Sequence, residues 1–141
     1  MADQQGVIPH LIVNDAAAAM EFYKNALGAT ETMRMPANDG KRLLHAEMQV
    51  NGAKIFMCDA FPEHSENHTG HGAPPKTLGG TSVMLHLDVP SCDDAVRRAV
   101  AAGATVTMEP WDAFWGARYG QVRDPFGHAW SFAHPLAGKP A

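Results

Sequence analysis

The chain has 141 residues, of which 45% are hydrophobic, and a formal net charge of −4, which predicts a single domain over residues 1–141 with enough apolar content for a core. No run approaches the roughly 20 apolar residues of a membrane span, and the first residues lack the basic and apolar parts of a signal peptide. We therefore expect a cytoplasmic protein that does not bind membranes. Because the chain has no basic cluster, we also expect that it does not bind nucleic acid.

The first half of the chain predicts a strand, a helix and three further strands. Residues 7–14 are apolar and β-branched, which is typical of a half-buried strand, and Asn14 or Asp15 can cap the helix that follows. Apolar side chains at helical spacing continue to Leu27, and Gly28 suits the left-handed residue that ends a helix. Three more strands are expected at residues 29–36, 41–51 and 53–60.

Residues 61–80 are rich in proline, glycine and histidine and carry no apolar periodicity, so we expect a linker or mobile loop there. Within this segment His64, His68 and His71 have the spacing of one helical face. The glycines and prolines around them disfavour a helix, so these histidines are expected in a solvated loop, with adventitious metal binding as the alternative.

The second half repeats the order of the first. Residues 82–89 predict a strand, Ser91 with Asp94 makes a capping-box-like start for a helix, and Gly103 ends that helix. Three closing strands are expected at about residues 104–109, 115–123 and 128–134.

Three anchors share nearly the same offset between the halves, which indicates an internal duplication. They are His10-Leu11-Ile12-Val13 with His86-Leu87-Asp88-Val89, Gly28-Ala29-Thr30 with Gly103-Ala104-Thr105, and Gly52 with Gly127. We therefore predict two βαβββ modules, at about residues 7–60 and 81–134. Each module buries little alone, so we expect an α+β fold in which both form a curved mixed sheet around a cleft, with the helices outside. Clefts of this kind commonly bind small ligands.

Strand alternation divides the side chains into a cleft-facing set and a helix-facing set. The expected cleft-facing set is His10, Ile12, Asn14, His45, Glu47, Gln49, Met84, His86 and Asp88. On the strand at 41–51, the expected apolar face is Leu44, Ala46, Met48 and Val50. The repeat makes Phe56 and Ser131 equivalent positions on two further strands.

Segments spread over residues 7–134 carry a family resemblance. They are Pro9-His10-Leu11, Asp15 through Lys24, Gly28-Ala29, His45-Ala46-Glu47, Leu78-Gly79-Gly80, Ala102-Gly103-Ala104, Trp115-Gly116-Ala117-Arg118 and, most specifically, Asp124-Pro125-Phe126-Gly127-His128-Ala129-Trp130. In them the chain resembles the vicinal oxygen chelate superfamily of glyoxalase, bleomycin-resistance and dioxygenase proteins, and its PhnB-like branch. Ala117 departs from the branch, which usually has an acidic residue there.

Metal enzymes of this superfamily draw their ligands from the first, fourth, fifth and eighth strands. The resemblance places His10, Phe56, His86 and Ser131 at those positions. Imidazole suits Zn, Ni, Fe or Mn, whereas a phenyl ring cannot ligate and a serine hydroxyl is a poor substitute for a carboxylate. The resemblance therefore implies a partial site in which His10 and His86 hold one divalent metal, and Glu47 or His45 could complete it.

The resemblance leaves several functions open. The leading expectation is a glyoxalase-like enzyme of lyase or isomerase type, in which the metal polarises vicinal oxygens and Glu47 is the catalytic base. The alternative is a metal-free protein that binds or sequesters an antibiotic or another small molecule. An extradiol-type dioxygenase is a weaker alternative, because Ser131 replaces a carboxylate ligand.

The candidate substrate-binding residues are Phe56, Trp115, Arg118 and Ser131. In the metal-free alternative Phe56, Trp115 and Arg118 matter more than the histidines. Arg118 lies in an aromatic stretch from Trp111 to Tyr119, where it could grip a carboxylate or phosphate, or the stretch could pack in a dimer interface. Members of the superfamily are commonly homodimers that sometimes exchange modules between subunits, so the resemblance also implies a homodimer.

Overall fold

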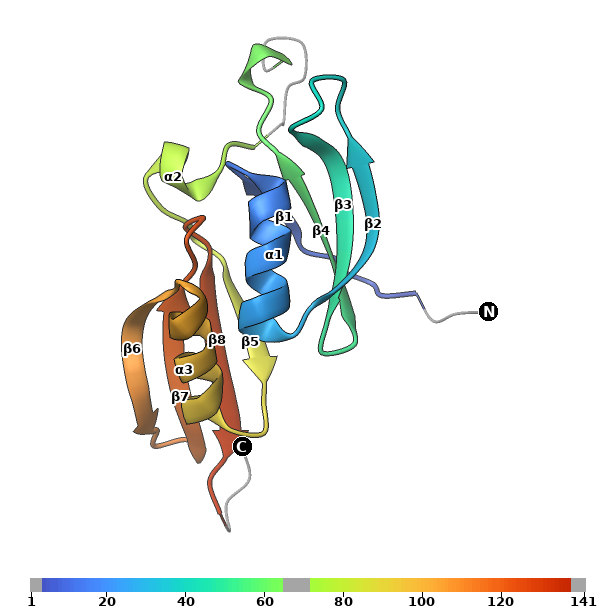
Figure 1. The fold of residues 1–141 in the computed structure, drawn as a ribbon. Helices are drawn as coiled ribbons and strands as arrows, with labels where there is room; N and C mark the ends of the chain where they lie inside the picture. The colour runs from blue at the N-terminus through green and yellow to red at the C-terminus, as the bar shows by residue number, and fades with distance from the viewer. Residues whose placement is uncertain (1–3, 65–71, 138–141) are drawn as a thin grey trace.

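The protein folds into two βαβββ modules (Figure 1), and the computed structural model describes residues 4–64 and 72–137. The first module comprises β1 (His10–Val13), α1 (Ala16–Leu27), β2 (Thr30–Pro36), β3 (Leu43–Val50) and β4 (Ala53–Asp59). The second comprises β5 (Met84–Asp88), α3 (Cys92–Ala102), β6 (Thr105–Asp112), β7 (Ala117–Arg123) and β8 (Ala129–Pro135). The α+β class and the duplicated module are confirmed.

The segment between the modules contains more regular structure than expected. It holds the 3₁₀ helix η1 (Pro62–His64) and the single helical turn α2 (Pro75–Leu78). Pro75 suits the first turn of α2, because proline fixes φ and lacks an N–H that would have no helical partner there. His68 and His71, expected in a solvated loop, lie outside the described residues.

Each module forms its own mixed four-stranded sheet. The strand orders are β1-β4-β3-β2 and β5-β8-β7-β6. The pairs β1–β4 and β5–β8 are parallel and the remaining neighbours are antiparallel. Among the described strands no ladder joins the two sheets and no closed barrel forms.

The two long helices begin and end where the sequence predicts. Asp15 caps α1 and Ser91 caps α3, each by accepting a hydrogen bond from the backbone N–H three residues later. Gly28, with φ +68°, and Gly103, with φ +128°, end them. No helix in the described part of the chain is long and apolar enough to cross a membrane.

A further hydrogen bond at the start of each helix is made by residues at equivalent positions of the two modules. Asp59, at the end of β4, accepts from the backbone N–H of Ala16, and His134, near the end of β8, accepts at Nδ1 from the backbone N–H of Cys92. Asp59 also accepts from the backbone N–H of Leu43, at the start of β3. One inner strand of each sheet, β4 or β8, thus holds the start of the helix of its own module.

The modules meet where α1 packs against α3. At this boundary Asp124 is 3% exposed and accepts hydrogen bonds from the Tyr23 hydroxyl at 2.5 Å and from Trp130 Nε1 at 2.9 Å. Burial, reinforced by the charge of Asp124, raises the pKa of Tyr23 well above its ordinary value. His128 adds a second link, because its Nε2 lies 3.0 Å from the Ile12 carbonyl oxygen, which can only accept.

One predicted side-chain orientation is wrong. Leu44 was expected on the apolar face of its strand, but it is 50% exposed, whereas its neighbour Leu43 is buried. The β2–β3 pairing shifts between Met35 and Pro36, so Leu44 is an extra residue at a bulge and the alternation slips there. The rest of the expected apolar face of β3 is buried.

Candidate functional site

On the face of the first sheet that points away from α1, three rings from three strands form a cluster. His10 of β1, His45 of β3 and Phe56 of β4 have centroid separations of 5.7 Å (His10–His45), 5.8 Å (His10–Phe56) and 4.7 Å (His45–Phe56), each with edge-to-face geometry. They meet because β4 lies between β1 and β3 in the sheet. We call these residues the first ring cluster.

Glu47, the candidate base, borders the first ring cluster. It pairs directly with Phe56 across the β3–β4 ladder. Its carboxylate lies 3.1 Å from Nε2 of His45 and 3.7 Å from Nζ of Lys54, and its side chain is 21% exposed. His10, Phe56 and Glu47 are therefore direct neighbours on one face of the first sheet. For His10 and Glu47 this is the shared face that strand alternation predicted.

The second sheet carries a hydrogen-bonded chain of Ser131, His86 and Asp88. His86 Nδ1 lies 2.7 Å from Ser131 Oγ, and His86 Nε2 lies 3.0 Å from Asp88 Oδ1. In the neutral ring, Nε2–H donates to the carboxylate and Nδ1 accepts from the serine hydroxyl. Ser131 is only 2% exposed, so its hydroxyl holds the imidazole and is not open to a substrate.

Aromatic residues extend this face. Tyr119 stacks on His86 with centroids 6.1 Å apart and an interplanar angle of 14°. Trp115 lies 5.4 Å from Tyr119, 5.7 Å from Trp111 and 5.1 Å from Phe114. Phe114 is 91% exposed and Trp115 is 46% exposed. We call His86 and these four aromatic residues the second ring cluster.

Arg118 lies on the opposite face of β7 from Tyr119, because successive side chains alternate. Its guanidinium bonds to Asp93 of α3 at 2.9 Å and to Asp112 of β6 at 3.0 Å. These hydrogen bonds raise the pKa of Arg118 and lower that of Asp93. Arg118, one of whose two expected roles was to grip an anion, is thus already bonded to two carboxylates, and it ties β7 to α3.

The two histidines of the repeat lie in different clusters on different sheets. Phe56 offers no donor beside His10, and both ring nitrogens of His86 are engaged by Ser131 and Asp88. Across residues 4–64 and 72–137, no group of three or more His, Cys, Asp or Glu side chains could hold a metal ion. The donors that the described residues of one chain bring together therefore do not fit a divalent metal site.

The structure reveals a further equivalence that the sequence did not show. Glu47 opposes Phe56 in the first sheet, and Gln121 opposes Ser131 in the second. Glu47 and Gln121 are therefore equivalent, and Gln121 donates to the Tyr119 hydroxyl at 3.0 Å. The turn between β7 and β8 is longer than the turn between β3 and β4, which changes the offset and conceals this match in the sequence.

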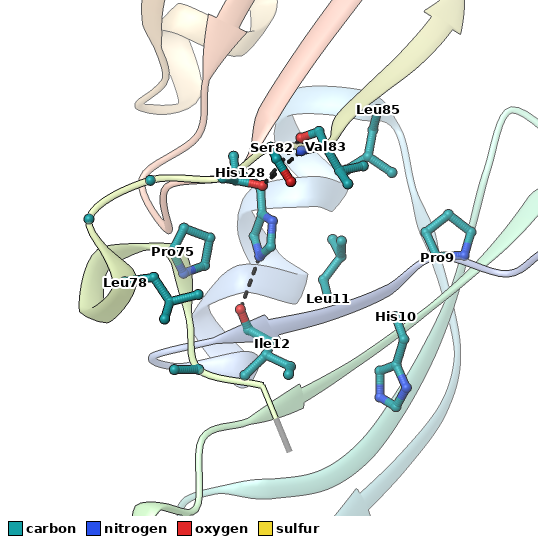
Figure 2. Close-up of a pocket in the computed structure, with 14 residues that line it drawn as sticks. Pro9, His10, Leu11, Ile12, Pro75, Leu78, Ser82, Val83, Leu85 and His128 are labelled. Carbon is teal, nitrogen blue, oxygen red and sulfur yellow. Dashed lines mark hydrogen bonds between the residues drawn. The ribbon is translucent and has the colours of Figure 1, made fainter. Parts of the chain in front are cut away.

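A cavity of about 700 Å³ lies beside the first ring cluster, between β1 and the segment that leads into β5. Figure 2 shows His10 at one side of this space, and His128 reaching across to the Ile12 carbonyl. Pro75 and Leu78 of α2 line the far side. The residues between the modules therefore form a wall of this cavity.

The sequence-family model of the glyoxalase/bleomycin resistance protein/dioxygenase superfamily matches residues 7–132 of this chain. The chain belongs to this superfamily. Protein Mb0911c of Mycobacterium bovis, named as uncharacterized, is 45% identical over 128 residues, which cover 91% of this chain and 82% of that protein.

Solved structures of the superfamily fold agree with this membership. The product of Arabidopsis thaliana At5g48480 has a TM-score of 0.70 and 28% identity, covering 93% of this chain and 99% of its own. The PhnB protein of Bacillus cereus has the same fold, with a TM-score of 0.64 at 16% identity and coverage of 92% and 99%. The predicted superfamily is confirmed, and its PhnB-like branch has a neighbour of this fold.

Proposed function

We propose that the protein binds a small planar molecule in a cup between two copies of the chain. The observation that carries this proposal is that each sheet bears a ring cluster on the face away from its helix, and that large apolar rings of the second ring cluster are open to solvent. Exposed apolar patches of this kind mark ligand or protein contacts.

A homodimer would use both faces. In the proposed arrangement, the first ring cluster of one copy faces the second ring cluster of its partner, and a twofold axis generates two equivalent cups. His10 and His86 would then meet between subunits, although they lie in separate clusters within one chain. The duplication of the module supports this, because equivalent strands contribute rings to the two clusters, β1 and β3 to the first and β5 and β7 to the second.

The chemistry of the two faces suits a planar ligand with polar edges. Aromatic rings from both clusters offer stacked or edge-to-face contacts. Glu47 from one side, and Gln121 and His86 from the other, offer hydrogen bonds that fix orientation. Binding of this kind needs no metal, and it corresponds to the bleomycin-resistance side of the superfamily.

Calorimetric titration with 1-naphthol, a neutral planar probe, tests this function. We expect saturable binding to the wild type, and a loss of about tenfold in affinity in Trp115→Ala and in Phe56→Ala, because each removes one face of the cup. Phe61→Ala is the control, since Phe61 lies outside both clusters, beneath the guanidinium of Arg42. Absence of binding, or equal affinities in all variants, would overturn the proposal.

The chain of Ser131, His86 and Asp88 favours a second candidate function, an enzyme of lyase or isomerase type. To accept a proton, His86 would have to exchange its hydrogen bond with the exposed Asp88 for one with the substrate, and Glu47 could be the second base. Metal analysis of the purified protein distinguishes between two hypotheses, a metal-dependent enzyme and a metal-free binding protein. Stoichiometric metal that is lost in both His10→Ala and His86→Ala would favour the metal enzyme.

A further inference from the structure

We infer that the ligand of this cup carries an anionic group, a phosphate or a carboxylate, and that Lys76 and Arg123 bind it. The inference rests on the proposed function and adds a ligand class to it. Its basis is a second cavity, of about 600 Å³, on the same face of the second sheet as the second ring cluster.

The strand register places this cavity directly beside the second ring cluster. Gln121 pairs with Ser131, which neighbours His86, and Arg123 pairs with Ala129, which neighbours Met84. Arg123 lies two residues after Gln121 on β7, so their side chains are on the same face of the sheet. From Tyr119 to Arg123 the strand extends about 13 Å, at about 3.3 Å per residue, which a small molecule can span.

The opposite wall comes from the segment between the modules. Lys76 of α2 lines the cavity together with Gly79, Gly80 and Thr81, and Arg123 lines it from β7. Lys76 and Arg123 thus approach the same space from two elements that are distant in the sequence.

Neither cation has a carboxylate partner in the part of the chain that the structure describes. Lys24, Arg34, Arg42, Lys54, Arg97 and Arg118 all form ion pairs, whereas Lys76 and Arg123 form none within residues 4–64 and 72–137. Asp124 also lines the cavity, but its two carboxylate oxygens already accept from Tyr23, Trp130 and two backbone N–H groups. The positive charges therefore remain available to a ligand.

The chemistry of the pair suits an oxyanion. A guanidinium can donate two parallel hydrogen bonds to a phosphate or carboxylate, and an ammonium adds a compact charge. Arg118, which the sequence offered as a candidate for this role, faces the other side of β7 and bonds to Asp93 and Asp112. The predicted ligand is a planar aromatic compound with an anionic end, whose ring lies on Tyr119 and Trp115.

Titration with 1-naphthyl phosphate, 1-naphthoate and neutral 1-naphthol tests the inference. We expect the wild type to bind at least one of the two anions more tightly than 1-naphthol, and the comparison of the anions shows whether phosphate or carboxylate is preferred. Lys76→Gln and Arg123→Gln should each weaken anion binding about tenfold, and leave 1-naphthol binding within about twofold. Lys41→Gln, which removes an equal charge from the β2–β3 turn, should change neither.

The outcomes distinguish the two levels of the proposal. If 1-naphthol binds but neither anion binds more tightly, the inferred anionic ligand is overturned while the proposed cup is retained. The same holds if the two cavity variants leave anion binding unchanged. If neither 1-naphthol nor the anions bind, the proposed function itself fails. Added salt should weaken binding of the anions but not of 1-naphthol, because it screens the two cations.

Discussion

At the scale of single residues, the buried carboxylate of Asp124 matters most for stability. Its two oxygens accept hydrogen bonds from module one, through Tyr23, and from its own turn and β8. A buried carboxylate that loses a donor costs more than the hydrogen bond itself, because its charge stays desolvated. The sequence indicated the tight turn at Asp124, but the partner Tyr23 lies 101 residues away and only the structure shows the contact.

Tyr23→Phe is predicted to lower the free energy of unfolding by about 1–3 kcal/mol at pH 7, because Asp124 loses a donor. The effect depends on pH. Burial raises the pKa of Tyr23 well above its ordinary value of 10.0, so above pH 10 the unfolded chain releases this proton while the folded chain retains it. Wild-type stability therefore falls as the pH rises past 10, and its advantage over the variant narrows.

Urea denaturation followed by circular dichroism between pH 7 and 11 measures both effects. Tyr119→Phe is the matched control, because this hydroxyl lies on the open face of the second sheet and accepts from Gln121. Equal stability of the two variants at pH 7 would show that the contact between Tyr23 and Asp124 does not stabilise the fold.

At the scale of elements, α3 lies close against β7 because Gly120 has no side chain. A Cβ at this position would lie 3.2 Å from Val96 Cγ2, and 3.3 Å from both Cys92 Sγ and Pro110 Cγ. A glycine inside a strand often marks such a close approach. The sequence predicts the strand and the helix, but their separation follows from how the two elements pack.

Gly120→Ala is predicted to destabilise the protein by about 1–3 kcal/mol, because the added methyl group overpacks the contact between α3 and β7. Gly80→Ala is the matched control, since nothing lies within 4 Å of a Cβ at that position. Thermal denaturation measures both, and we expect a lower Tm for Gly120→Ala only. Equal melting temperatures would contradict the packing argument.

At the scale of the whole molecule, each sheet has one face that no other part of the described chain covers. Phe114, at 91% exposure, and Trp115, at 46%, are large apolar side chains that a solvated surface does not favour. A second copy that covers them would remove this surface from water and form the proposed cup.

Light scattering during size-exclusion chromatography is predicted to show the wild type at twice the mass of one chain. Phe114→Glu should shift it towards monomer, because burying an unpaired charge at an interface is costly. Val100→Glu, on the exposed surface of α3, is the control and should remain dimeric. A monomeric wild type, or a dimeric Phe114→Glu, would contradict the proposed arrangement.

The sequence by itself determined the modules, the helix limits and most strand faces, because these follow from local periods and caps. Asp15 and Gly28 limit α1 whatever the rest of the chain does. Only the tertiary structure decided which side chains meet. The chain of Ser131, His86 and Asp88 and the common cavity of Lys76 and Arg123 depend on strand register and on elements distant in sequence, where a shift of one residue reverses every face.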